Sequence, residues 1–197
     1  PDEGSGGSSA GPGAATAAGL VAFALGTDTL GSIVGPSRTC GITGLRPTFG
    51  RVSRHGVMPV CWSLDKVGPM ARSAEDCALV FAAIHGADGA DLAVKDAPFD
   101  WEDAAGVEGL RVGYLASAFE GEIRAGQRVR RENDLATLAA LRDLGVDPRP
   151  VELPEHADMD PLQMLLVDES AAFAELLASG DVQYFRQDID EPEDVLM

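Results

Sequence analysis

Two segments rich in glycine and serine carry the residue types that could do chemistry. The first is Gly6-Gly7-Ser8-Ser9-Ala10-Gly11, and the second is Gly26-Thr27-Asp28-Thr29-Leu30-Gly31-Ser32-Ile33. A sharp turn from a strand into a helix points successive backbone N–H groups into one small space, which is the arrangement needed to hold an oxyanion. A serine at the end of that turn, Ser32, would have its hydroxyl beside those donors. On spacing alone, a plain turn whose serine caps the next helix is the favoured interpretation.

The elements around these segments predict an α/β protein. Pro12 suits the first turn of a helix that stops at Gly19, and residues 22–25 predict a buried strand. Ser73 is expected to cap a helix that continues to Ile84. The remaining expectations are a surface loop at 86–108, strands at 110–115 and 147–153, helices at 124–144 and 161–178, and a poorly ordered acidic tail at 188–194. Strands that alternate with helices are typical of α/β architecture.

The run from Gly6 to Gly50 closely resembles the signature of the amidase signature family. The matching pieces are Ala17-Ala18-Gly19-Leu20-Val21, Leu25-Gly26-Thr27-Asp28-Thr29, the residues from Gly44 to Ser53, and those from Ser63 to Ser73. The resemblance covers about the first half of the chain. It implies a mixed central β-sheet flanked by helices, with residues 1–197 forming part of a single domain. Residues 1–92 would be its signature core, and residues 93–197 a less diagnostic region of helices and strands with an acidic C-terminal tail.

The resemblance implies hydrolysis of a carboxylic amide through an acyl-enzyme, by a Ser–Ser–Lys triad. Ser32 matches the nucleophile and Ser8 the bridging serine, which in this family follows a cis peptide bond, here Gly7–Ser8. The developing oxyanion would be held by backbone N–H groups worth about 3 kcal/mol each. Those groups are the N–H groups of Thr29, Leu30, Gly31 and Ser32. Supporting positions are matched by Ser9, Thr27 and Asp28.

The lysine of the triad has no match among these residues. In the family it lies several tens of residues before the bridging serine, which here would be upstream of Pro1. Lys66 belongs to a later part of the signature, and Lys95 lies in the acidic loop. The first residue is not Met, and motif-like sequence follows almost at once. We therefore expect an internal fragment of a longer enzyme that is inactive by itself.

Two positions depart from the family pattern. Leu30 stands where glycine is common, so a positive φ at this residue would be strained. Val34 stands where an arginine usually follows the isoleucine after the nucleophile, which removes a charged partner for Asp28. We interpret both as variation within a subfamily, because Ser8, Asp28 and Ser32 are all present.

Three alternatives stand beside this interpretation. Residues 7–11 also fit the G-x-S-x-G nucleophile elbow with Ser9 as nucleophile, but the elbow requires a buried strand before it, and residues 1–5 cannot form one. A phosphate-binding loop is weaker, since no Gly-Lys-Ser/Thr follows and Asp28 would repel phosphate. The third alternative is a family member that works within a complex. It would be the glutamine-amidase (A-type) subunit of a tRNA-dependent amidotransferase, or a non-catalytic binding module.

Composition limits the partners. A net charge of −17 disfavours direct contact with nucleic acid or an anionic membrane, and no apolar run of about 18 residues predicts a membrane span. The three cysteines are too widely spaced for a metal-binding pair, and we predict buried free thiols in a reducing cytoplasm. We expect no metal, no cofactor and a small-molecule amide as substrate. The residues do not identify that amide, and they leave open a partner subunit or a homo-oligomer.

Overall fold

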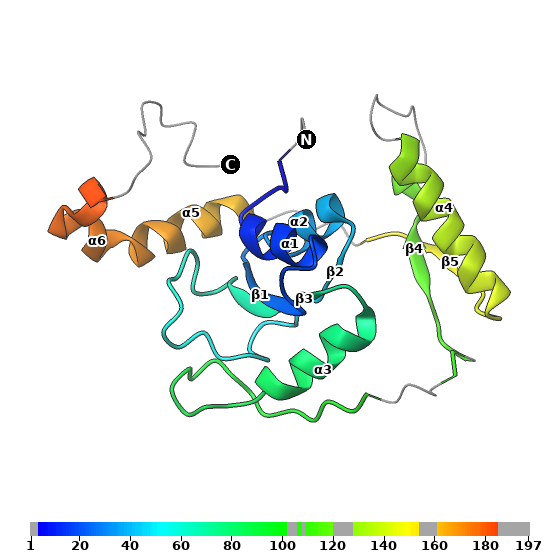
Figure 1. The fold of residues 1–197 in the computed structure, drawn as a ribbon, viewed down its shortest axis with the longest axis horizontal. Coiled ribbons are helices and arrows are strands. Elements are labelled where there is room, and N and C mark those ends of the chain that lie inside the picture. Colours follow the sequence, from blue (N-terminus) through cyan, green and yellow to red (C-terminus); the bar gives the residue numbers. More distant parts are fainter. Residues whose placement is uncertain (1–3, 102–105, 108, 120–127, 154–160, 185–197) are drawn as a thin grey trace. The chain divides into compact units, whose positions relative to one another are not determined.

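The computed structural model describes residues 4–101, 106–107, 109–119, 128–153 and 161–184 (Figure 1). The chain divides into two compact units. Unit 1 comprises Pro1–Trp101 and Asp160–Met197, and unit 2 comprises Glu102–Met159. Helices and small sheets of both pairing types are present, which confirms the predicted α/β class. Within the described ranges, no helix combines the length and the apolar character that crossing a membrane would need.

Unit 1 is built on a three-stranded antiparallel sheet in the order β1-β3-β2. Its strands are β1 (Phe23–Asp28), β2 (Thr43–Gly44) and β3 (Lys66–Ala71). In this register Gly26 faces Gly68 and Asp28 faces Lys66. The central strand β3 is the buried one, and Met70 and Ala71 have no exposed surface. The strand predicted at 22–25 exists, but burial was expected for it and Phe23 and Leu25 remain 48% and 45% exposed. Burial alternates along β1, so these two side chains share the face of the strand that the described residues leave exposed.

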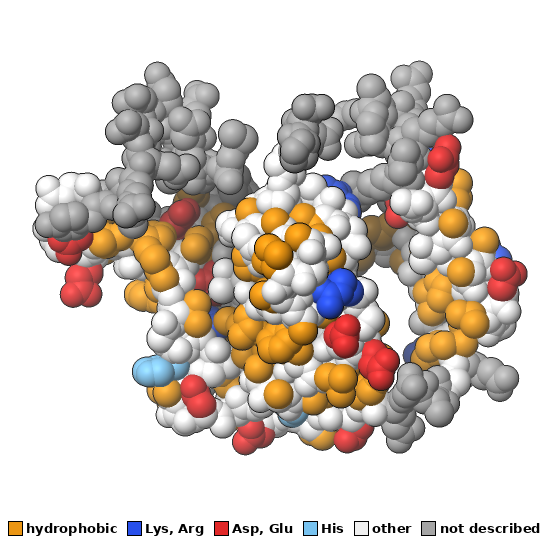
Figure 2. All heavy atoms as spheres, viewed as in Figure 1, with side chains coloured by type: hydrophobic (Ala, Val, Ile, Leu, Met, Phe, Trp, Pro, Cys, Tyr) orange, Lys and Arg blue, Asp and Glu red, His pale blue; other side chains and the backbone are white. Residues whose placement is uncertain are grey.

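Three helices pack on this sheet. They are α1 (Ala10–Ala17), α2 (Val34–Cys40) and α3 (Ala74–Ile84). Gly19, with φ 72°, follows the end of α1, as the sequence predicts. The Ser73 hydroxyl accepts a hydrogen bond from the Asp76 N–H, which confirms the predicted cap of α3. Helix α1 packs against β1, β3 and α2, and α3 packs mainly against β3, with fewer contacts to β2 and β1. Hydrophobic side chains gather on the surface of unit 1 around α1 in the view of Figure 2.

The core of unit 1 connects β3 to α3. Val52, Val67 and Phe81 form its buried cluster, and Phe99 packs on that cluster from the segment after α3. The cysteines are free thiols, as predicted, and Cys61 and Cys77 are buried while Cys40 is half-buried. Burial also raises the pKa of the Cys77 thiol.

The predicted helix at 161–178 is two helices. They are α5 (Pro161–Ala172) and α6 (Ala174–Ser179), and Phe173 between them has φ −95° and ψ 0°. The Asp168 carboxylate of α5 accepts hydrogen bonds from the Ser63 hydroxyl and from the Ser63 N–H at 3.2 Å. A short 3-10 helix, η2 (Asp181–Tyr184), follows α6. The acidic tail predicted at 188–194 lies outside the described residues.

Unit 2 contains a two-stranded parallel sheet and one long helix. Strands β4 (Gly113–Leu115) and β5 (Arg149–Val151) pair with each other, and they are shorter than predicted. A 3-10 turn, η1 (Ala116–Ala118), follows β4, and α4 (Arg128–Asp143) connects the two strands. The first residues predicted for that helix, 124–127, lie outside the described ranges. Leu138 of α4 and Val146 after it are buried apolar residues of this unit.

Candidate functional site

The turn from β1 into α2 is built around one buried carboxylate. Asp28 ends β1 and has no exposed surface. Its two oxygens accept hydrogen bonds from the backbone N–H groups of Gly31 at 2.8 Å, Ile33 at 2.8 Å and Val34 at 3.4 Å. Arg46 adds a cation 3.6 Å from the same carboxylate. The segment that contains Ser32 is therefore held by side-chain to backbone hydrogen bonds as well as by helix α2.

The structure accommodates both departures from the family pattern, Leu30 and Val34, through neighbouring residues. Among the described residues, positive φ values occur only at glycines, and in this turn the positive value, 146°, falls at Gly31. Leu30 therefore does not carry the strain that a positive φ would cause. Val34 does remove one cation, but Arg46 supplies another beside Asp28. Asp28 therefore keeps a charged partner despite Val34, and this partner comes from the segment after β2.

The first glycine- and serine-rich segment is hydrogen-bonded to this turn. Ser9 is buried, and its hydroxyl donates to the Thr27 carbonyl at 3.1 Å and accepts from the Thr27 N–H at 3.2 Å. The Ser9 N–H donates to the carbonyl oxygen of Ser32 at 3.1 Å. The Gly7–Ser8 peptide bond is cis, as the family resemblance implies. Ser8 is thus the immediate neighbour of a residue that is bonded to Ser32. In the described part of the chain, the Ser8 and Ser32 hydroxyls are not hydrogen-bonded to each other.

The N–H groups expected to hold an oxyanion differ in their partners. The Gly31 N–H is engaged by Asp28. The N–H groups of Thr29, Leu30 and Ser32 have no acceptor among the residues that the structure describes. Because a free donor is what a developing negative charge needs, these three groups are the ones that the turn leaves available.

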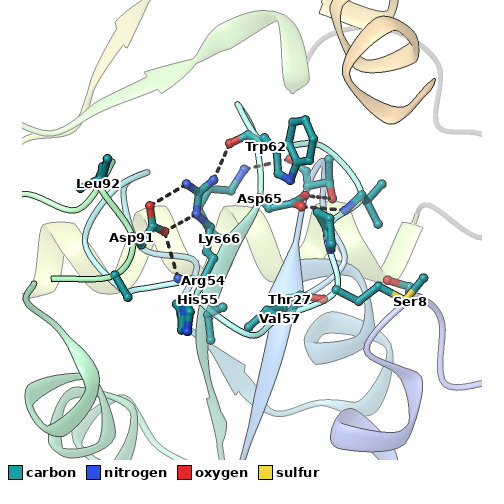
Figure 3. A pocket seen from close by; sticks show the side chains of 16 residues that line it. Ser8, Thr27, Arg54, His55, Val57, Trp62, Asp65, Lys66, Asp91 and Leu92 are labelled. Atoms are coloured by element: carbon teal, nitrogen blue, oxygen red, sulfur yellow. Dashed lines mark hydrogen bonds and ion pairs between the residues drawn. The ribbon is translucent and has the colours of Figure 1, made fainter. Parts of the chain in front are cut away.

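A cavity of about 270 Å³ opens beside the two segments (Figure 3). Ser8, Thr27 and Thr29 line it from the segments already described, whereas Ser32 is not among its lining residues. Its other polar lining residues are Arg54, His55, Asp65, Lys66 and Asp91. Its apolar lining comes mainly from the segment before β3, including Val57, Met58, Val60 and Trp62. The cavity therefore combines a polar wall with an apolar one.

Lys66 lies in this cavity, although the sequence placed it only in a later part of the signature. Its ammonium donates to the Thr29 carbonyl at 2.9 Å. Burial lowers the pKa of Lys66, while the nearby charge of Asp28 acts in the opposite direction. The missing signal was the strand pairing, because the antiparallel register sets Lys66 opposite Asp28, at the start of the turn. Nothing in the linear sequence specifies that register.

The acidic residue before Lys66 supports the same turn. Asp65 accepts a hydrogen bond from the Thr29 hydroxyl at 2.6 Å through one oxygen. Its other oxygen accepts from the N–H groups of Val60 at 2.8 Å and Cys61 at 3.0 Å. Thr29 is therefore bonded twice to the first residues around β3, once through its hydroxyl and once through its carbonyl oxygen.

The far side of the cavity is closed by an ion pair. The Arg54 guanidinium binds Asp91 through Nε at 2.8 Å and Nη2 at 3.1 Å, and it also donates to the Trp62 carbonyl. The hydrogen bond from Arg54 holds the pKa of Asp91 well below its usual range. Ser53 donates to Asp88 at 2.5 Å, and this bond is the main reason why the pKa of Asp88 is lowered to about 2. The loop after α3 is thereby tied to the segment that precedes the cavity wall.

The described residues contain no group of three or more His, Cys, Asp or Glu side chains that could hold a metal ion. What the site offers is a serine in a tight turn, unengaged backbone donors beside it, a second serine on an adjacent segment and a small cavity. A serine nucleophile and free oxyanion donors are two of the parts that acyl transfer to a serine requires, and a general base is the third.

Comparison with known sequences identifies relatives over nearly the whole chain. The family model described as amidase matches residues 1–195. The A-type subunit of the glutamyl-tRNA(Gln) amidotransferase of Roseiflexus sp. (strain RS-1) is 41% identical over 186 residues, which are 91% of this chain and 37% of that protein. The chain thus spans little more than a third of the length of the curated relatives it matches.

Solved structures of proteins of the same kind are also similar to this chain. The A-type subunit of the glutamyl-tRNA(Gln) amidotransferase of Thermotoga maritima is 32% identical with a TM-score of 0.73, over 87% of this chain and 38% of that one. The native peptide amidase of Stenotrophomonas maltophilia is 32% identical with a TM-score of 0.69, over 91% of this chain and 41% of that one.

Proposed function

The chain belongs to the amidase family, and we propose that it supplies the serine nucleophile of an enzyme that hydrolyses carboxylic amides to an acid and an amine or ammonia. The observation that carries this proposal is the β1–α2 turn. Asp28 engages three of its backbone N–H groups, and those of Thr29, Leu30 and Ser32 have no acceptor among the residues that the structure describes. A turn in which a serine lies beside unengaged donors supports attack on a carbonyl and stabilisation of the resulting oxyanion.

Ser32 would attack the amide carbonyl and form an acyl-enzyme, which water then hydrolyses. Ser8 would pass the Ser32 proton to a base and return it to the departing amine. The oxyanion would be held by the N–H groups of Thr29, Leu30 and Ser32, with that of Gly31 retained by Asp28. Ser9 and Thr27 hold the two segments together through their mutual hydrogen bonds.

We further propose that the base is a lysine outside these 197 residues, so that they do not turn over an amide by themselves. By analogy with the family, that lysine would precede Ser8 in the natural chain, and the enzyme would work in the cytoplasm without a cofactor. A purified chain of residues 1–197 that hydrolysed an amide in a Ser32-dependent way would contradict this part of the proposal.

Glutamine hydrolysis within an amidotransferase is the second candidate. The specific observation in its favour is the 41% identity to the A-type subunit of a glutamyl-tRNA(Gln) amidotransferase. A partner protein would then be required, and direct contact with tRNA would not fall to this acidic chain. Glutamine turnover that depends on an added partner would select this candidate, whereas turnover of other amides by the chain alone would select a free-standing amidase.

The test uses the longest natural chain that contains this sequence. Ammonia release is measured over a panel of glutamine, short peptide amides and aliphatic amides, for the wild type and for Ser32→Ala. We expect Ser32→Ala to lose at least about 10³-fold in kcat, as for other serine nucleophiles. The matched control is Ser170→Ala, an exposed serine of α5 whose hydroxyl, among the described residues, bonds only to the Leu166 carbonyl. Full activity in Ser32→Ala would overturn the proposal, and a folded wild type inert toward every amide would favour the non-catalytic alternative.

A further inference from the structure

Lys66 has hydrogen-bonding capacity that the protein does not use. A lysine ammonium carries three N–H donors. The structure gives Lys66 one acceptor, the Thr29 carbonyl at 2.9 Å. Among the described residues, no carboxylate forms an ion pair with it. Figure 3 shows Lys66 reaching into the cavity between the Arg54–Asp91 pair and Asp65.

The other charged side chains of the cavity are already engaged. Arg54 uses its guanidinium on both oxygens of Asp91 and on the Trp62 carbonyl. Asp65 accepts three hydrogen bonds, from the Thr29 hydroxyl and from two backbone N–H groups. Neither carboxylate therefore has a strong need for a substrate cation, and the charge of Arg54 is neutralised by its ion pair with Asp91. Among the described residues, Lys66 is the cationic lining residue whose charge has no ion-pair partner.

The charge around the cavity also favours Lys66 over the other charged lining residues as the group that binds an anion. The chain as a whole has a net charge of −17, so a small anion approaching an average part of its surface is repelled. In the cavity, the formal charges of Arg54 and Lys66 balance those of Asp65 and Asp91. A substrate with a carboxylate would thus find its favourable electrostatic partner at Lys66, in the same cavity as Ser8 and Thr29.

We propose that Lys66 is a specificity-determining residue that selects amides bearing a carboxylate, by donating a charge-assisted hydrogen bond to that carboxylate while the amide carbonyl lies at the β1–α2 turn. The substrate class is therefore an amide whose acyl part ends in a second, ionised carboxyl group. This inference rests on the proposed amide hydrolysis and narrows it.

A purely structural role for Lys66 makes a different prediction. If Lys66 served only to hold the Thr29 carbonyl, its replacement would impair every amide equally. A role in substrate selection would instead change the ratio between charged and neutral substrates. The measurement must therefore compare matched substrates rather than a single rate.

The experiment measures kcat/KM of the full natural chain for malonamate, succinamate and glutaramate. Each is paired with a neutral counterpart in which a methyl ketone replaces the carboxylate. We expect the wild type to prefer the charged member of the best pair, and Lys66→Gln to reduce that preference about 10- to 100-fold, the usual range for one charge-assisted hydrogen bond. Lys66→Arg, which keeps the charge, should retain most of the preference. Lys95→Gln removes the same charge from an exposed loop and should leave it unchanged.

The outcomes separate the two proposals. A wild type that hydrolyses amides but shows no preference for the carboxylate overturns the inference and leaves amide hydrolysis standing. Equal losses on both members of a pair in Lys66→Gln also overturn it, since they assign Lys66 to the support of Thr29. A wild type that hydrolyses no amide at all removes the proposed function, and the inference falls with it.

Discussion

The β1–α2 turn of unit 1 and the α4–β5 region of unit 2 hold their chains together in different ways. In the turn, a buried aspartate bonds to the backbone and glycines allow strands to approach closely. In unit 2, buried side chains such as Leu138 and Val146 contact their neighbours only through apolar surface. Backbone hydrogen bonds fix residue identity at a position, whereas apolar packing fixes little more than size and spacing. The turn is accordingly the part where the sequence carries a specific signal.

The largest effect should come from Asp28. In Asp28→Ala, three backbone N–H groups in or near the core lose their acceptor, and Arg46 loses its partner. We expect a loss of about 3 to 5 kcal/mol in the free energy of unfolding. Both tryptophans, Trp62 and Trp101, lie in unit 1, so urea unfolding followed by fluorescence reports on this unit. The exposed Asp143 of α4 provides the control. If Asp28→Ala and Asp143→Ala unfolded at a similar urea concentration, the turn would not depend on its buried aspartate more than unit 2 depends on an exposed one.

The next largest loss of stability should come from Gly68, where the backbone of Leu45 approaches too closely to leave room for a side chain. An alanine at position 68 would overlap the carbonyl oxygen of Leu45, which cannot withdraw because the Leu45 N–H is bonded to the Pro69 carbonyl. We expect Gly68→Ala to cost about 3 kcal/mol. Gly113→Ala in unit 2 would meet the Val151 side chain at 2.8 Å, where a side chain rather than backbone has to shift, so its cost should be about 1 kcal/mol. Equal costs, measured by urea unfolding monitored by circular dichroism, would contradict this difference.

The stability of unit 2 should depend on the apolar volume of its buried side chains. Leu138 is 8% exposed and Leu135, one turn earlier on α4, is 51% exposed. We expect Leu138→Ala to destabilise unit 2 by about 2 kcal/mol and Leu135→Ala by less than about 0.5 kcal/mol. Hydrogen exchange of the α4 amides measures both. If the two variants exchanged at the same rate, packing by Leu138 would not be what stabilises this unit.

The smallest effect should come from the ion pair at the cavity. Because Arg54 lowers the pKa of Asp91, the pair stabilises the folded state fully above the ordinary pKa of 3.8 and progressively less as the pH falls below it. Asp91→Asn should cost about 1 kcal/mol at pH 7, and the difference from the wild type should shrink below about pH 4. Asp147→Asn is the control, because its pair with Arg149 is 78% and 79% exposed and should contribute almost nothing. A difference for Asp91→Asn that stays constant down to pH 2 would contradict the assignment to this carboxylate.

The sequence predicted most of the elements and where they lie along the chain, but not the contacts across the sheet. The cap at Ser73 and the stop at Gly19 were predicted from local patterns, and the cis bond before Ser8 was implied by the family resemblance. The position of Lys66 opposite Asp28 depends on strand register, which no local pattern specifies. The same holds for Arg46, which takes the place of the cation that Val34 removes. The break at Phe173 was missed because residues 161–178 are continuous in helix-forming composition.

The most direct test of the central claim is to trap the acyl-enzyme. The full natural chain is mixed with an amide that it hydrolyses, quenched in acid within one turnover, digested, and analysed by peptide mass. We predict an acyl adduct on Ser32, absent from Ser32→Ala and present in Ser9→Ala if that variant folds. An adduct on Ser8 or Ser9 instead, or turnover with no adduct on any serine, would contradict the assignment of Ser32 as the nucleophile.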